Sequence, residues 1–95
     1  MLVEIKKLNI ENHGHKRNIT LERMYINTTN IVSITDYEGA KTFLLREESR
    51  LSQEKFSLIK LNEGNNVQEI IVYGTAEDIY ASFSSVSSGR VLLND

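Results

Sequence analysis

Two histidines in a polar segment are the first residues of this chain whose type and spacing suggest chemistry. His13 and His15 flank Gly14 within residues 11–18, a stretch without apolar side chains. Imidazole nitrogens bind zinc, but a catalytic zinc usually has three protein ligands and a fixed second shell. Two histidines in a solvent-exposed loop supply too few ligands, so no metal site is expected.

The carboxylates and serines give no better case for catalysis. Glu47 adjoins Glu48, and Glu77 adjoins Asp78, but adjacent residues do not share one face of a helix. No serine lies in a Gly-X-Ser-X-Gly motif, and the chain has no cysteine. The five glycines are scattered, so neither a phosphate-binding loop nor a dinucleotide fingerprint is present. We therefore expect no catalytic residues and no cofactor, and we do not expect an enzyme.

Basic residues gather near the beginning of a chain whose net charge is -2. The candidates for contacts with nucleic-acid phosphates and bases are Lys6, Lys7, Lys16, Arg17, Arg23 and Tyr25. Pairing of two N-terminal strands would bring some of them together. The acidic balance of the whole chain and the lack of a nucleic-acid-binding motif argue against a dedicated binder. The alternative interpretation is an ordinary solvated face.

The strands that would carry these basic residues share an unusual hydrophobic pattern. Residues 3–10 and 19–26 are each apolar at the first, third, sixth and eighth positions and charged at the middle two. Side chains two residues apart share a face of a strand, so each segment changes face at its centre. A β-bulge would restore the phase. The pattern predicts two paired strands with bulges near residues 6–7 and 22–23, joined by a long loop over residues 11–18.

The middle of the chain predicts a small sheet. Residues rich in strand formers predict strands at 31–37, 55–61 and 67–73. The segment 62–66 has the composition of a hairpin loop, and the asparagines and threonines of residues 27–30 favour a turn. Residues 40–51 follow helical spacing, but residues 43–45 also fit a short buried strand, so both alternatives stay open.

A helix is expected to begin after Thr75. The Thr75 hydroxyl is placed to accept the backbone N–H of Asp78, and acidic side chains suit the positive end of a helix dipole. Its buried stripe is expected to consist of Ala76, Ile79 and Phe83. The serines at positions 82, 84, 85, 87 and 88, with Gly89, are expected to end it.

With 95 residues, the chain has room for one hydrophobic core. We expect one compact α+β domain over residues 1–85, with a small antiparallel β-sheet of about five strands, a bulged N-terminal hairpin and one or two short helices. Residues 86–95 are expected to form a flexible tail, whose Val91, Leu92 and Leu93 are candidates for contacts between subunits. The beginning of the chain does not resemble a signal peptide, and no apolar run is long enough to span a bilayer, so a cytoplasmic location is expected.

Residues 24–83 resemble small FlbD-like proteins in the order of their elements. The similarity rests on Met24–Ile34, where a strand leads through an asparagine turn to an Ile-rich strand, on the hairpin segment Phe56–Gly64, and on Ile71–Ile79. It does not include the N-terminal strand pair, the insert at 38–54 or the tail, and it implies no catalytic residues. The Asn- and Ile-rich composition also resembles that of small tailed-phage proteins of unknown function.

These observations favour a non-enzymatic interaction or assembly module. Small size and a strand-rich layout indicate a homo-oligomer, or a complex with a protein partner, formed through sheet edges or the C-terminal tail. The alternative is a small nucleic-acid-binding regulator that uses the basic N-terminal hairpin. The first hypothesis predicts that mass depends on protein concentration, and the second predicts binding that depends on salt.

Overall fold

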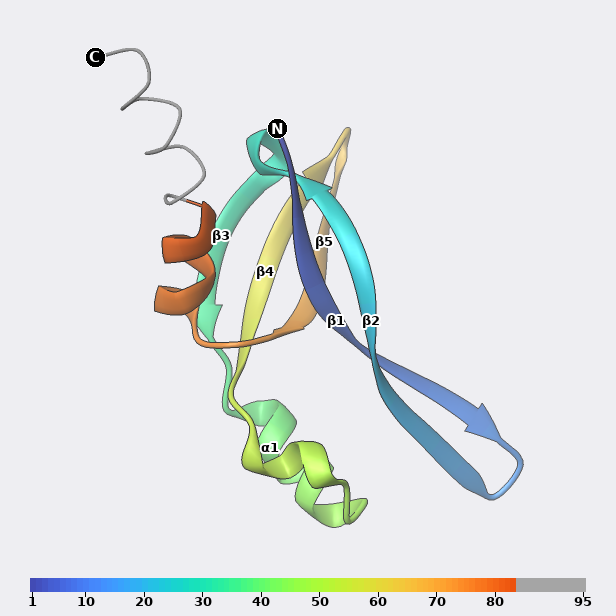
Figure 1. The fold of residues 1–95 in the computed structure, drawn as a ribbon. Coiled ribbons are helices and arrows are strands. Elements are labelled where there is room, and N and C mark those ends of the chain that lie inside the picture. Colours follow the sequence, from blue (N-terminus) through green and yellow to red (C-terminus); the bar gives the residue numbers. More distant parts are fainter. Residues whose placement is uncertain (84–95) are drawn as a thin grey trace.

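The computed structural model describes residues 1–83, which form one curled antiparallel sheet with short helices beside it (Figure 1). The strands are β1 (Leu2–His13), β2 (Lys16–Asn27), β3 (Ile31–Asp36), β4 (Phe56–Glu63) and β5 (Asn66–Tyr73), in the spatial order β2-β1-β5-β4-β3. The 3-10 turn η1 (Thr28–Asn30) joins β2 to β3, while helix α1 (Gly39–Arg46) and the 3-10 turn η2 (Arg50–Gln53) precede β4. A second helix, which we call the C-terminal helix, begins at residue 76. The predicted α+β class is confirmed.

Each of the two hairpins turns over two residues, the first of which is glycine. Gly14 has φ 64° and Gly64 has φ 65°, whereas the residues that follow them have negative φ. This is the pattern of a type II′ turn, whose twist matches that of the flanking strands. Strands β1 and β2 therefore continue to His13 and Lys16. The predicted long loop over residues 11–18 is wrong, because polar residues extend the strands as an exposed two-stranded ribbon.

The predicted bulges near residues 6–7 and 22–23 are also wrong. The register between β1 and β2 is unbroken from Leu2 opposite Asn27 to His13 opposite Lys16. The change of hydrophobic face is real, however, because the sheet is covered on both sides. Val3 and Ile5 of β1 and Met24 and Ile26 of β2 serve one core. Leu8 of β1 and Ile19 and Leu21 of β2 serve another.

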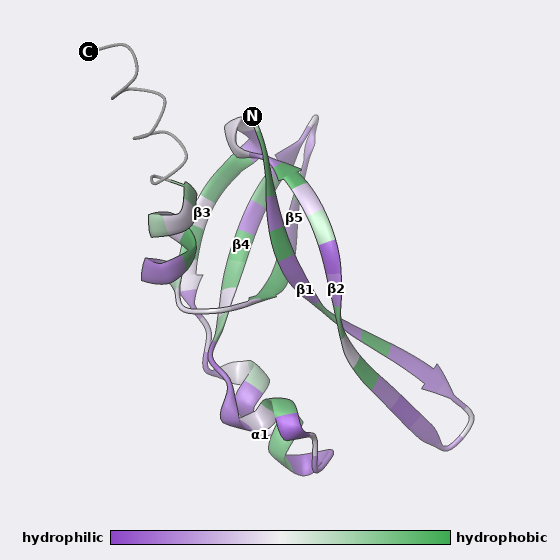
Figure 2. Ribbon diagram, in the orientation of Figure 1, coloured by the Kyte–Doolittle hydropathy of each residue, from purple (hydrophilic) through white to green (hydrophobic). Residues whose placement is uncertain are grey.

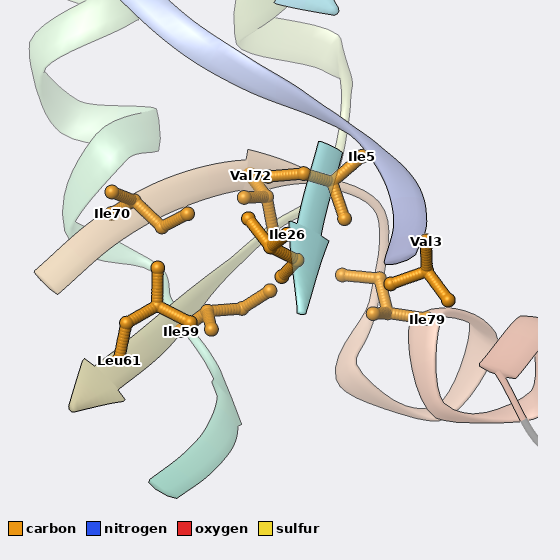
Figure 3. Close-up of a cluster of buried hydrophobic side chains, with 8 residues drawn as sticks. All are labelled: Val3, Ile5, Ile26, Ile59, Leu61, Ile70, Val72 and Ile79. Atoms are coloured by element: carbon orange, nitrogen blue, oxygen red, sulfur yellow. The ribbon is translucent and has the colours of Figure 1, made fainter. Parts of the chain in front are cut away.

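We call these two groups of buried side chains the first and second clusters. The first cluster consists of Val3, Ile5, Ile26, Ile59, Leu61, Ile70, Val72 and Ile79 (Figure 3). The second consists of Leu8, Ala40, Leu44 and Phe56. Alternation along β1 places Val3 and Ile5 on one face and Leu8 on the other, so the clusters lie on opposite faces of the sheet. The strand crosses from one core to the other without a bulge.

Helix α1 supplies the second cluster with Ala40 and Leu44 and confirms the helical alternative for this part of residues 40–51. It is shorter than predicted, because Glu48 adopts φ 56° and ends it. The Ser49 N–H donates to the Leu44 carbonyl at 3.0 Å and the Glu48 N–H to the Leu45 carbonyl at 3.1 Å, a Schellman motif. Since a glycine usually takes this position, no residue type in the sequence indicated the early end of the helix.

The helix that begins at residue 76 is capped as predicted, and it has a second cap from elsewhere in the chain. The Asp78 N–H donates to Thr75 Oγ1 at 3.1 Å, and Ile79 belongs to the first cluster with Phe83 packed against it. The Ala76 N–H donates to Asp36 Oδ1 at 2.9 Å. A carboxylate at the end of β3 therefore fixes where this helix starts, which suits the positive end of its dipole.

The two edge strands of the sheet differ in length and regularity. Strand β3 has 6 residues, and its pairing with β4 shifts register between Ile31 and Ser33. Strand β2 has 12 residues in unbroken register with β1. Figure 1 shows the far part of the β1–β2 hairpin extending beyond the rest of the sheet, and Figure 2 shows it as mostly hydrophilic. We call this part, residues 9–20, the hairpin arm.

Candidate interaction surface

The structure places the histidines at the tip of the hairpin arm. His13 lies opposite Lys16, and its Nε2 is 3.1 Å from Glu11 Oε2 in a contact between two exposed side chains. Within residues 1–83, no three His, Asp or Glu side chains are grouped closely enough to hold a metal ion. The arrangement of His13 is that of a solvated surface pair, which contributes little to stability.

One carboxylate does affect a neighbouring acid. Tyr73 Oη donates to Glu54 Oε2 at 3.1 Å, and this hydrogen bond, together with the negative charge of Glu54, raises the pKa of Tyr73 above its ordinary value of 10.0. Tyr73 also packs edge-on against Phe56, with ring centroids 6.2 Å apart. A phenol that stays protonated at neutral pH, held by an exposed carboxylate, serves here to join β5 to the segment before β4.

The candidate basic residues are divided among three places. Lys6 and Arg23 lie directly opposite each other, and Tyr25, two residues along β2, shares their face. Lys7 points to the other face, opposite Glu22. Lys16 and Arg17 lie about 20 Å further along the hairpin. Arg17 pairs with Asn12, which is six residues along β1 from Lys6. The structure therefore brings together Lys6, Arg23 and Tyr25 but not all six residues that were predicted to contact nucleic acid.

Two of the arginines are already paired within the chain. Arg23 Nε is 2.8 Å from Glu4 Oε1, and Arg17 forms an ion pair with Glu47. The Arg17 guanidinium also lies 5.7 Å from the centre of the Phe43 ring. Arg17 thus ties the hairpin arm to the end of α1, and the predicted role in nucleic-acid binding stays a prediction for these residues.

The outer edge of β2 is an open backbone edge of the sheet. Apart from the ladder with β1, the backbone groups of residues 17–25 make no hydrogen bond to any part of the described chain. A long, regular edge of this kind is a template for another strand. Sequence reasoning shortened this edge, because the predicted loop took residues 16–18 out of the 12-residue strand β2. The two-residue turn at Gly14 was the signal that would have found it.

A groove runs along this edge. It has a volume of about 540 Å³ and is lined by Ile19, Thr20 and Leu21 of β2 and by Ser49, Arg50, Leu51 and Glu54. Consecutive strand residues point to opposite faces, so a groove that touches three in a row must follow the backbone edge itself. Ile19, Leu21 and Leu51 are partly buried against the second cluster and give the groove an apolar floor.

A second groove lies between β1 and the start of the C-terminal helix. It has a volume of about 480 Å³, and the charged side chains that line it are of both signs: Glu4, Lys6, Arg23 and Asp78. Its wall also includes Tyr73 and Ile79. Opposite charges at close quarters cancel most of the field that would attract an ion. This groove therefore offers no single ligand chemistry.

The predicted contact residues Val91, Leu92 and Leu93, and the whole predicted tail, lie outside the described residues. Within residues 1–83, no helix has the length and apolar character of a membrane-spanning segment. No family model, no curated protein and no solved structure matches this chain.

Proposed function

We propose that this chain is a non-enzymatic assembly module of the cytoplasm that self-associates through the outer edge of β2. The single observation that carries the proposal is a strand of 12 residues at the edge of the sheet whose outward backbone groups have no partner in residues 1–83. Soluble proteins normally shorten, bend or cover such an edge, because it pairs readily with other chains.

The contrast between the two edges supports a role for β2. Strand β3 has two of the protective features, since it is short and its register shifts at Val32. Strand β2 has neither, and the chain contains no proline that could interrupt it. One edge of the same sheet is thus protected, and the other is available for pairing.

The hairpin arm gives a second reason. A two-stranded ribbon without a third strand is marginally stable in water. Ile10 is 42% exposed at the position opposite Ile19, so the arm leaves apolar surface uncovered. A further strand added to β2 would complete a three-stranded arm and give the outward backbone groups their hydrogen bonds.

Light scattering over a range of protein concentrations tests the proposal. We expect an oligomer at micromolar concentration whose dissociation constant rises about tenfold when Asn18→Lys and Thr20→Lys place like charges along the β2 edge. Both positions are exposed, so the fold should be preserved. The matched control, Val32→Lys with Thr35→Lys, adds the same charge to exposed positions of β3 and should leave association unchanged. A strict monomer would contradict the proposal, as would loss of association on deletion of residues 86–95.

Nucleic-acid binding is a second candidate, favoured by the exposed group of Lys6, Arg23 and Tyr25 on one face of the hairpin. If this group contacts phosphates and bases, binding to random RNA or DNA should weaken with salt, and Lys6→Ala should reduce the slope of log affinity against log salt by about 1. Lys41→Ala, an exposed lysine of α1, is the control. An affinity that does not change with salt concentration, or equal losses of affinity in Lys6→Ala and Lys41→Ala, would rule out this face.

A further inference from the structure

The turn at the tip of the hairpin decides which backbone groups of β2 point outward. In a two-residue hairpin, the residues that flank the turn form a hydrogen-bonded pair, here His13 and Lys16. Hydrogen-bonded and non-hydrogen-bonded pairs then alternate along the ladder. The even-numbered residues of β2 therefore bond to β1, while the N–H and C=O groups of the odd-numbered residues, Arg17 to Tyr25, point away from it.

The two parts of this edge differ in what lies beside them: the last part lies against η1 and β4, whereas the first part borders the groove that it shares with residues 49–54. Residues 24–27 of β2 line a cavity of about 170 Å³ together with Asn30, Leu61 and Glu63. That end of the strand therefore faces η1 and β4 across the curled sheet. The open stretch is residues 16–23, and the groove beside Ile19, Thr20 and Leu21 lies at its centre.

The charges on residues 16–23 are complementary to those of an identical strand that runs antiparallel to it. Lys16 and Glu22 lie three residues on either side of Ile19. An antiparallel copy of the strand, centred on Ile19, puts Lys16 opposite Glu22 twice, with Asn18 opposite Thr20 and Arg17 opposite Leu21. Opposite charges on directly opposed residues stabilise a strand pair, and like charges destabilise it.

We propose that the occupant of this edge is the β2 strand of a second copy, related by a two-fold axis at Ile19. This inference rests on the proposed function and specifies its geometry. The hydrogen-bonded pairs across the axis are Ile19 with Ile19 and Arg17 with Leu21, all of them odd-numbered residues with outward groups. Two five-stranded sheets thereby join into one continuous sheet through an isologous interface.

Three other positions of the two-fold axis, at Thr20, Leu21 and Glu22, are disfavoured by charge or by the fold. An axis at Thr20 sets Arg17 opposite Arg23, and an axis at Glu22 sets that carboxylate opposite itself. An axis at Leu21 forms no opposite-charge pair, and it extends the pairing to residues 24–26, which face the chain's own β4. The axis at Ile19 is the one that gains two ion pairs and stays within the open stretch.

Engineered cysteines test the register directly, because the chain has none of its own. Opposed residues of a hydrogen-bonded pair have Cα atoms about 5.5 Å apart, within the range of a disulfide. Full-length Ile19→Cys should therefore form a covalent dimer on mild oxidation. Leu21→Cys should not, since the two Leu21 residues lie about 13 Å apart in this register. Because Ile19 is half-buried, a second measurement uses exposed positions: Asn18→Cys mixed with Thr20→Cys should cross-link, and each alone much less.

Charge reversal provides an independent test by sedimentation. Lys16→Glu alone and Glu22→Lys alone should each weaken association roughly tenfold, and the double variant should restore it, because the pairs are re-formed with exchanged signs. Circular dichroism checks that each variant is folded. An oligomer that cross-links through Leu21→Cys, or fails to cross-link at Ile19 and at Asn18 with Thr20, would overturn this register but leave self-association intact. A monomer would overturn both.

Discussion

Replacing Ile59 with alanine is expected to lower the free energy of unfolding by about 2–5 kcal/mol, the range for Ile→Ala in a packed core. Ile59 is 0% exposed at the centre of β4 and belongs to the first cluster. The surrounding side chains come from β1, β2, β5 and the C-terminal helix, so they cannot collapse easily into the space left behind (Figure 3). Urea unfolding followed by circular dichroism measures the effect.

Ile10→Ala is the matched control for this substitution. Ile10 is also a strand isoleucine, but it is 42% exposed on the hairpin arm. Its replacement should change the free energy of unfolding by less than about 1 kcal/mol. Equal losses for the two variants would contradict the placement of the core around β4.

Gly74→Ala is expected to destabilise the protein by about 1–3 kcal/mol, through backbone strain. Gly74 has φ 111°, which side-chain-bearing residues rarely adopt. Its N–H donates to the Lys55 carbonyl at 2.8 Å, and its carbonyl accepts from Ser57 Oγ at 2.7 Å. These bonds hold the link between β5 and the C-terminal helix, so the chain has little freedom to relax to a negative φ.

The sign of the effect at Gly74 tests whether its positive φ strains a residue with a side chain. An added Cβ would lie 3.5 Å from Ile79 Cγ1, an ordinary contact, so crowding is not the cause. At a glycine with negative φ, alanine would instead stabilise by about 0.4–1 kcal/mol, because it reduces the entropy of the unfolded chain. Thermal unfolding of Gly74→Ala should therefore occur at lower temperature than the wild type. Lys55→Ala, which leaves the same backbone bond in place, should be near neutral.

The paired strands, the capped helix and the α+β class are all features that the sequence made predictable, because each depends on residues close together in the chain. The hairpin at residues 56–73 follows from two runs of strand formers around Gly64. The Thr75 cap follows from one hydroxyl and a backbone N–H three residues away. The hydrophobic pattern shared by residues 3–10 and 19–26 likewise predicted that these segments pair.

The error of the predicted bulges in the N-terminal hairpin has a physical cause. A change of hydrophobic phase within a strand is explained equally by a bulge with one core or by a straight strand with two cores. The sequence of the strand does not distinguish them, since the answer depends on what covers each face. Here α1 contributes Leu44 to one side of the sheet, and the C-terminal helix contributes Ile79 to the other.

The open edge of β2 was likewise decided by the tertiary structure. The residue types of β2 suit a central strand as well as an edge strand, and its position follows from the strand order β2-β1-β5-β4-β3. Ion pairs between distant segments, Arg17 with Glu47 and Arg23 with Glu4, depend on the same packing and divide the basic residues that appear as one group in the sequence.

The sequence by itself therefore determined the local elements and the scarcity of chemical groups in this protein, because propensity, turn chemistry and residue type act over a few residues. Only the tertiary structure decided which face each half of a strand buries, which edge stays unpaired and which charges remain free. Those properties arise from contacts such as Asp36 with Ala76, 40 residues apart, whose partners are chosen by the packing of the whole sheet.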